Sequence, residues 1–322
     1  MQVLILGAGG MIGRKLTTRL LADRQIDGQP IDRLLLHDIA PVAPPNTTAV
    51  TVSTRQGNLS DPGEAERLIA DRPAVIFHLA AVVSGEAEQN FDKGWDVNVR
   101  GSWALLEAIR AQGDDYRPRL VFTSSIAVFG APFPEAIDDE FLSAPLTSYG
   151  TQKAVDELLL GDYSRKGFVD GIGLRLPTIC VRPGKPNAAA SSFFSSIIRE
   201  PLAGQTAILP VSDSVRHWFA SPRAAVGFLV HAAGLDTDLL GPRRNLTLPG
   251  LSCTVAEQIE ALREVAGNDT VSRIEHRPDD AIIRIVEGWP RNFDARRAEA
   301  LGFQAEKRFA DIIRIYLDDD AP

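Results

Sequence analysis

The feature that most constrains this chain is a glycine-rich turn that follows its first apolar run. Val3–Leu6 ends at Gly7, and two more glycines follow at positions 10 and 13, where a helical pattern opens. A buried strand, a glycine turn and a helix form the first unit of dinucleotide-binding α/β folds. Without side chains, the backbone of such a turn can approach a pyrophosphate at the helix N-terminus. A tight turn without a ligand would use the same glycines, so the turn alone leaves both interpretations open.

The same alternation continues through the first half of the chain. Short runs rich in Val, Ile and Leu lie between amphipathic stretches, as expected for strands that are buried on both faces of a parallel sheet. Repeated strand–helix–strand units imply right-handed crossovers and a doubly wound, Rossmann-like α/β fold. Between residues 40 and 54, prolines and threonines predict a surface loop and a short strand. The other predicted core strands are Leu34–His37, Val75–Leu79, Leu120–Thr123 and Ile172–Leu176.

The second half of the chain is less regular, because prolines interrupt it repeatedly. Helical patterns nevertheless recur at Ser191–Arg199, Ala224–Gly234 and Val255–Ala266. We therefore expect a dinucleotide-binding domain over residues 1–176, to which later segments return. Residues 177–322 are expected to form mainly a smaller C-terminal substrate-binding lobe.

Composition and charge argue against several classes of partner. With 322 residues, 44% of them hydrophobic, the chain can bury a large core. A net charge of −8 opposes nucleic acid or an anionic membrane as main partner, and no apolar run reaches the roughly 18 residues of a membrane span. The first residues lack a basic leader, so a cytoplasmic location is expected. Cys180 and Cys253 stand far apart without a neighbouring histidine, so we expect neither a disulfide framework nor a metal site.

An acidic residue marks the end of the second core strand. Asp38 follows Leu34–His37, where a carboxylate can accept hydrogen bonds from the adenosine ribose hydroxyls of a dinucleotide. The same carboxylate would repel a phosphate on that ribose. Asp38 therefore predicts a preference for NAD over NADP, although a helix cap or turn would also use this residue type.

Three side chains suggest the chemistry. Tyr149 and Lys153 are four residues apart, which on a helix puts them on one face. The ammonium stabilises a phenolate and lowers the tyrosine pKa from about 10, so Tyr149 can take a hydroxyl proton while a hydride leaves the same carbon. Ser125 ends a core strand at the sheet edge where ligands of open α/β folds bind, and its hydroxyl can orient the substrate oxygen. Together, these three side chains predict a dehydrogenase.

Together these motifs resemble the extended short-chain dehydrogenase/reductase family, also called the NAD-dependent epimerase/dehydratase family. The resemblance covers residues 1–235 well and the remainder loosely. It rests on the glycine turn, Asp38, His78-Leu79-Ala80-Ala81, Asn98-Val99-x-Gly101, Ser124-Ser125-Ile126-Ala127-Val128-Phe129-Gly130, Tyr149-x-x-x-Lys153 and Leu174-Arg175.

The resemblance implies roles for individual residues. It assigns catalysis to Ser125, Tyr149 and Lys153. It also implies a homodimer that pairs through helices at residues 98–112 and 149–160. One departure is Asn58, where the family usually carries Asp, although the amide oxygen can still reach the adenine amino group. The implied NAD-binding residues are Gly7, Gly10, Met11, Ile12, Gly13, Asp38, Asn58, Leu59, Leu79, Ala80, Ala81, Asn98, Tyr149, Lys153 and Pro177.

A second departure concerns the substrate. Sugar-nucleotide enzymes of the family usually carry an aromatic residue and an Asn after Leu174-Arg175, and both are missing here. Residues 182–194 instead form a basic, hydroxyl-rich stretch suited to a small carboxylate. This stretch and residues 215–224 resemble a branch of the family that oxidises the 2-hydroxyl of a four-carbon sugar acid with NAD. The implied substrate-binding residues are Ser125, Tyr149, Arg182, Asn187, Ser191, Ser192 and Arg216, and either Arg182 or Arg216 would bind the carboxylate.

Two other functions remain open on the sequence. A nucleotide-sugar epimerase or dehydratase would keep NAD tightly bound and return the hydride to its substrate. A dinucleotide sensor without chemistry would not need the Ser125, Tyr149 and Lys153 set. His217 and Trp289 are more readily explained by packing than by catalysis.

Overall fold

The computed structural model describes residues 1–46, 49–184 and 190–321. The chain forms two compact units, each built from segments that are distant in sequence. The first unit comprises Met1–Val128, Thr147–Arg175 and Val226–Leu246, and the second comprises Phe129–Leu146, Leu176–Ala225 and Thr247–Pro322.

A seven-stranded sheet organises the first unit. Its strands are β1 (Gln2–Leu6), β4 (Arg33–Asp38), β5 (Thr51–Gln56), β6 (Val75–His78), β7 (Arg119–Ser125), β8 (Asp170–Leu176) and β12 (Asn245–Thr247). Their order is β12-β8-β7-β6-β1-β4-β5, and β5, β4, β1, β6 and β7 pair in parallel. The chain first adds strands on one side of β1 and then on the other. Ligands of doubly wound sheets bind beside the carboxyl ends of the strands at this point of reversal.

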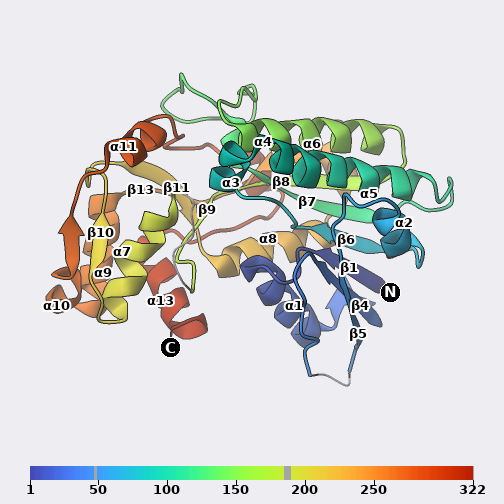
Figure 1. The fold of residues 1–322 in the computed structure, drawn as a ribbon, viewed down its shortest axis with the longest axis horizontal. Helices are drawn as coiled ribbons and strands as arrows, with labels where there is room; N and C mark the ends of the chain where they lie inside the picture. Colours follow the sequence, from blue (N-terminus) through green and yellow to red (C-terminus); the bar gives the residue numbers. More distant parts are fainter. Residues whose placement is uncertain (47–48, 185–189, 322) are drawn as a thin grey trace. The chain divides into compact units, whose positions relative to one another are not determined.

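Helices cover both faces of this sheet (Figure 1). Helix α1 and the later helix α8 lie on one face, whereas α2, α5 and α6 lie on the other. A short hairpin, β2 and β3, follows α1, with Asp27 and Gly28 at positive φ in its turn. The helices and the hairpin are α1 (Met11–Asp23), β2 (Gln25–Ile26), β3 (Gln29–Pro30), α2 (Glu64–Ile69), α3 (Ser84–Gln89), α4 (Phe91–Gly94), the π-helix η1 (Trp95–Arg100), α5 (Gly101–Arg110), the 3₁₀ helix η2 (Ile126–Val128), α6 (Ser148–Arg165), α8 (Pro222–Gly234) and the 3₁₀ helix η3 (Thr237–Leu240).

The second unit contains two small sheets and several helices. One sheet has the order β13-β11-β9, and the other pairs β10 with β14 in parallel. Phe194, Phe219, Leu262 and Ile312 are fully buried in a core of this unit. The elements are β9 (Thr178–Ile179), α7 (Ser192–Leu202), β10 (Ala207–Leu209), β11 (Arg216–Ala220), β13 (Leu251–Thr254), α9 (Val255–Ala266), α10 (Asn268–Val271), β14 (Ile274–His276), α11 (Asp280–Glu287), α12 (Arg296–Ala300) and α13 (Phe309–Asp319).

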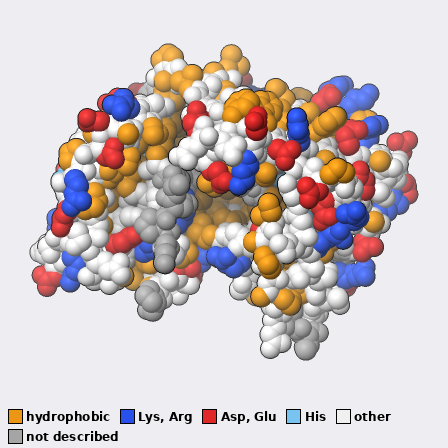
Figure 2. Space-filling model, viewed as in Figure 1, with side chains coloured by type: hydrophobic (Ala, Val, Ile, Leu, Met, Phe, Trp, Pro, Cys, Tyr) orange, Lys and Arg blue, Asp and Glu red, His pale blue; other side chains and the backbone are white. Residues whose placement is uncertain are grey.

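The fold predicted from the sequence is confirmed. All five predicted core strands appear within one or two residues of their expected bounds, and the helical patterns at residues 191–199, 224–234 and 255–266 became α7, α8 and α9. No helix among the described residues is long and apolar enough to cross a membrane. On the face shown in Figure 2, acidic and basic side chains are interspersed over the described surface.

Candidate active site

The glycine turn lies between β1 and α1 in the first unit. Gly7 has φ +85°, and a Cβ on it would lie 2.7 Å from the Ala80 backbone nitrogen. A Cβ on Gly13 would lie 2.2 Å from the Gly7 oxygen, so neither position accepts a side chain. Gly10 caps α1 without a side-chain hydrogen bond, and the first turn of α1 contains no acidic residue. The N–H groups at the start of α1, including those of Met11 and Ile12, therefore have no intrahelical partner and can hold a pyrophosphate.

Asp38 lies beside this turn at the end of β4. Its Oδ2 accepts the Gly9 N–H at 2.9 Å, and its Oδ1 accepts the Ala40 N–H at 3.0 Å. The neighbouring β4 residue, His37, accepts the Gly7 and Ala8 N–H groups through its carbonyl oxygen. These bonds fix the carboxylate against the glycine turn, where one oxygen can still accept a ribose hydroxyl.

The other predicted cofactor residues of the first unit lie at neighbouring strand ends. Asn58 and Leu59 follow β5, and the buried Leu59 packs next to Gly101. The partly buried residues Leu79–Ala81 follow β6, and the Leu79 N–H donates to the Leu6 carbonyl at 2.9 Å. The residues present thus fit a dinucleotide that lies along the carboxyl ends of β1, β4, β5 and β6.

Asn98 has a different environment from these residues. It lies in the π-helix η1 and is 1% exposed. Its Oδ1 accepts the Val82 N–H at 2.7 Å, and its Nδ2 donates to the Val82 carbonyl at 3.1 Å and to Gln152 Oε1 at 2.7 Å. The Asn98 amide is therefore occupied within the protein, where it ties the segment after Ala81 to α6.

The predicted catalytic side chains gather at the start of α6. Thr147 caps this helix by accepting the Gly150 N–H at 3.1 Å, which places Tyr149 in the first turn. Lys153 follows one turn later and is 2% exposed. Its Nζ lies 4.5 Å from the centre of the Phe122 ring on β7 and 5.8 Å from the centre of the Tyr149 ring.

Electrostatics at this site follow from burial. Burial raises the pKa of Tyr149 to about 12, although a hydrogen bond to Ser125 acts in the opposite direction. Burial also lowers the pKa of Lys153, while the neighbouring carboxylates of Asp156 and Glu157 raise it. Without a further positive charge, Tyr149 is therefore protonated at neutral pH.

A buried polar cluster lies next to Lys153, and most of its members were not predicted from the sequence. Ser102 Oγ lies 3.3 Å from Asp156 Oδ2 and 2.9 Å from His78 Nε2. Arg175 holds the Glu157 carboxylate with two hydrogen bonds, from Nε to Oε1 at 2.9 Å and from Nη2 to Oε2 at 2.7 Å. The i, i+3 and i, i+4 spacing from Lys153 would have placed both carboxylates on its helix face, and this is the signal that could have found them.

The predicted substrate residues belong to the second unit, apart from Ser125 and Tyr149. Arg182 Nη2 donates to Ser191 Oγ at 2.8 Å, beside Ser192 at the start of α7. Burial lowers the pKa of Arg182. Pro177 is buried between β8 and β9. Asn187 lies outside the described residues.

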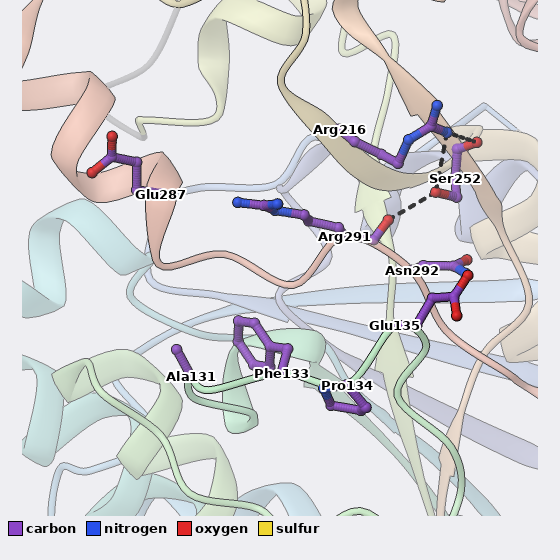
Figure 3. Close-up of a pocket in the computed structure, with 9 residues that line it drawn as sticks. All are labelled: Ala131, Phe133, Pro134, Glu135, Arg216, Ser252, Glu287, Arg291 and Asn292. Atoms are coloured by element: carbon purple, nitrogen blue, oxygen red, sulfur yellow. Dashed lines mark hydrogen bonds between the residues drawn. The ribbon is translucent and has the colours of Figure 1, made fainter.

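Arg216 lies instead on β11, where its guanidinium is already engaged. It donates to the Ser252 carbonyl at 3.1 Å and pairs with Glu257 at 3.2 Å. It also lines a pocket with a volume of about 760 Å³, whose walls come from the second unit (Figure 3). Sequence reasoning missed the other cation of this pocket, Arg291, because it stands outside every motif.

His217 and Trp289 have packing roles, as expected, with 5.2 Å between the centres of their rings. His217 is 3% exposed, and its ring stacks on Phe194 with 5.4 Å between ring centres. Its Nδ1 lies 2.8 Å from the Pro290 carbonyl and its Nε2 lies 2.7 Å from Thr178 Oγ1. Burial lowers the pKa of His217 to about 4, so the neutral ring donates to Pro290 and accepts from Thr178.

Comparisons with known proteins agree with this geometry. The family model described as NAD dependent epimerase/dehydratase family matches residues 3–229. The chain is 50% identical to D-erythronate dehydrogenase of Cupriavidus necator, over 99% of this chain and 98% of the relative. It is 43% identical to D-erythronate dehydrogenase of Haemophilus influenzae, over 99% of this chain and 100% of the relative.

Two solved structures are also similar. The nucleoside-diphosphate-sugar epimerase from Agrobacterium tumefaciens superposes with a TM-score of 0.97 at 59% identity, over 99% of this chain and 94% of that one. A GalE-like L-threonine dehydrogenase from Cupriavidus necator superposes with a TM-score of 0.84 at 23% identity, over 99% of both chains, a likeness that shows the fold alone. The chain therefore belongs to the NAD-dependent epimerase/dehydratase family, with NAD as its cofactor.

Proposed function

We propose that this protein oxidises D-erythronate at C2 to 2-dehydro-D-erythronate, with NAD as hydride acceptor. The observation that carries the proposal is the arrangement of Tyr149 in the first turn of α6, one turn before the buried Lys153, together with Ser125 at the carboxyl end of β7. Full-length identities of 50% and 43% to D-erythronate dehydrogenases support the choice of substrate.

Each of the three side chains has one task in the proposed mechanism. Ser125 donates a hydrogen bond to the substrate oxygen and orients it toward Tyr149. Lys153 stabilises the phenolate, so that Tyr149 Oη takes the proton of the C2 hydroxyl. Bound NAD supplies the acceptor for the hydride that leaves C2. In the reverse direction the Tyr149 hydroxyl returns its proton to the oxygen.

We assign cofactor binding to the first unit and substrate binding mainly to the second. Gly7–Gly13 would hold the pyrophosphate, Asp38 the adenosine ribose, and Asn58 and Leu59 the adenine. Ala80 and Ala81 would follow the cofactor backbone. Asn98 acts through its two hydrogen bonds to Val82 and thereby positions this segment.

A nucleotide-sugar epimerase is the second candidate, because the Agrobacterium tumefaciens structure bears that name at 59% identity. The pocket of the second unit favours the sugar acid. It is lined by Arg216 and Arg291 and by Glu135 and Glu287, and Arg216 is already paired with Glu257. A diphosphate would bring at least two negative charges next to Glu135 and Glu287, whereas a sugar acid brings one.

The first test is turnover with a defined set of substrates. We expect the absorbance of the reduced cofactor to grow when the protein is mixed with NAD and D-erythronate. It should not grow when NADP replaces NAD, because Asp38 repels the additional phosphate. UDP-sugars serve as the comparison. Silence on all four- to six-carbon aldonates, together with an isomerised UDP-sugar, would move the protein to the epimerase class.

We also propose a homodimer that pairs through α5 and α6. These helices lie next to each other on one face of the sheet (Figure 1), and each presents a large exposed apolar side chain, Trp103 at 53% and Leu158 at 76% exposure. Light scattering should give twice the chain mass of 34.9 kDa for the wild type. Leu158→Asp should give the monomer, and Leu239→Asp, at another exposed leucine on η3, should not. A wild-type monomer would contradict the proposal.

A further inference from the structure

The pocket of the second unit is bounded by three segments far apart in sequence. They are residues 131–135, the strands that carry Arg216 and Ser252, and the chain from Glu287 to Asn292 (Figure 3). Its volume of about 760 Å³ falls in the range of roughly 300–1,000 Å³ that small-molecule sites occupy. The first segment begins a few residues after Ser125 along the chain.

Backbone and aromatic contacts hold the pocket walls in place. The Ile137 N–H donates to the Asn292 carbonyl at 3.0 Å, and the Asp294 N–H donates to the Ile137 carbonyl at 2.8 Å. Phe293 packs between Phe129 and Trp218, with 5.8 and 5.5 Å between ring centres. The residues on either side of Phe293 are therefore fixed before any ligand arrives, and such preorganisation lowers the cost of binding.

The two guanidinium groups of the pocket differ in their partners. Arg216 is held by Ser252 and Glu257, so its charge is already matched. Ser252 Oγ also donates to the Arg291 carbonyl at 2.8 Å, which fixes the backbone of Arg291. In the part of the chain that the structure describes, the Arg291 guanidinium has no ion pair or hydrogen bond, and it extends into the open pocket toward the side where Glu287 lies, with Phe133 below it in Figure 3.

We propose that Arg291 binds the carboxylate of the substrate and thereby selects sugar acids over neutral polyols. A free guanidinium with a fixed backbone suits a bidentate pair with a carboxylate. Glu135 and Asn292 line the same pocket and offer oxygen acceptors to the hydroxyl groups of the acid. Arg182 is less available, because it is partly buried and bonded to Ser191. This assignment rests on the proposed function and names the group that sets its substrate class.

The test compares Arg291→Met with the wild type on D-erythronate and on its neutral amide. Loss of a charge-assisted hydrogen-bonded pair should raise KM for D-erythronate by about 10- to 100-fold, with kcat and the KM for NAD little changed. The preference for the acid over the amide should collapse by a similar factor. Arg291→Lys should restore part of the preference, because it keeps the charge but not the planar fork.

Two further variants keep the result interpretable. Arg284→Met removes an exposed guanidinium from α11, next to the pocket segment but not in its lining, and should leave KM unchanged. If Arg291→Met retains the wild-type preference, or if Arg216→Met instead abolishes it, the assignment is wrong. A wild type that turns over no aldonate would overturn the proposed function, and this assignment with it.

Discussion

Tyr149→Phe lowers kcat for D-erythronate by about 10²- to 10⁴-fold, the usual contribution of a positioned acid/base. The substitution removes the only atom of this side chain that can take the hydroxyl proton, and it leaves the ring in place. Because Lys153 remains beneath the ring and the glycine turn is untouched, the Kd for NAD should stay within about twofold of the wild type. The rate of NADH formation measures kcat, and fluorescence titration with NAD measures the Kd separately.

A second tyrosine of the same helix provides the control. Tyr163→Phe also removes a phenol hydroxyl from α6, one that donates to Glu107 and accepts from Trp103, and it should keep kcat near the wild-type value. The pH profile adds a second readout. Burial raises the Tyr149 pKa to about 12, so the oxidation rate of the wild type should rise with pH as the phenolate forms. A Tyr149→Phe variant that keeps its turnover and the rising limb would exclude the proposed mechanism.

The sheet and the catalytic helix could be predicted because local patterns determine them. Runs such as Val3–Leu6 and Leu120–Thr123 are apolar almost throughout, which is typical of strands in a parallel sheet that is covered on both faces. Gly7 and Gly13 could be assigned because a side chain at either position meets backbone atoms. For Gly13 the physical reason lies within the motif itself, in the backbone of Gly7 and Ala8, whereas for Gly7 it is the backbone of Leu79 and Ala80.

The substrate pocket could not be predicted in the same way. Arg291 becomes relevant only through the bridge between Ile137 and Phe293, which joins segments more than a hundred residues apart. The resemblance to the sugar-acid branch implied Arg182 or Arg216, because these residues lie in the two stretches that carry that resemblance. Neither pattern reveals that Ser191 or Glu257 already engages those guanidinium groups. Pairing of charges is a tertiary property, so the choice between the three arginines depends on the folded structure.

The ion pair between Glu157 and Arg175 also depends on tertiary contacts that the sequence does not reveal. Of all the substitutions considered, we expect the loss of one partner of this pair to lower the free energy of unfolding most. Glu157 is 5% exposed and Arg175 is 14% exposed, and Ser124 Oγ donates to Glu157 Oε1 at 2.5 Å. Removing one partner of a buried pair leaves an uncompensated charge, which usually costs about 3–5 kcal/mol. Arg175→Met should therefore lower the free energy of unfolding by about that amount, measured by urea denaturation.

Removing both charges separates the cost of an orphaned carboxylate from the net value of the pair. Glu157→Leu combined with Arg175→Met should be clearly more stable than Arg175→Met alone, because no charge is then left buried. Arg263→Met serves as the exposed control, since its partner Glu260 is 68% exposed and such pairs contribute about 0–1 kcal/mol. If Arg175→Met were no more destabilising than Arg263→Met, water would have to reach Glu157, and the buried position that we assign to this carboxylate behind Lys153 would be wrong.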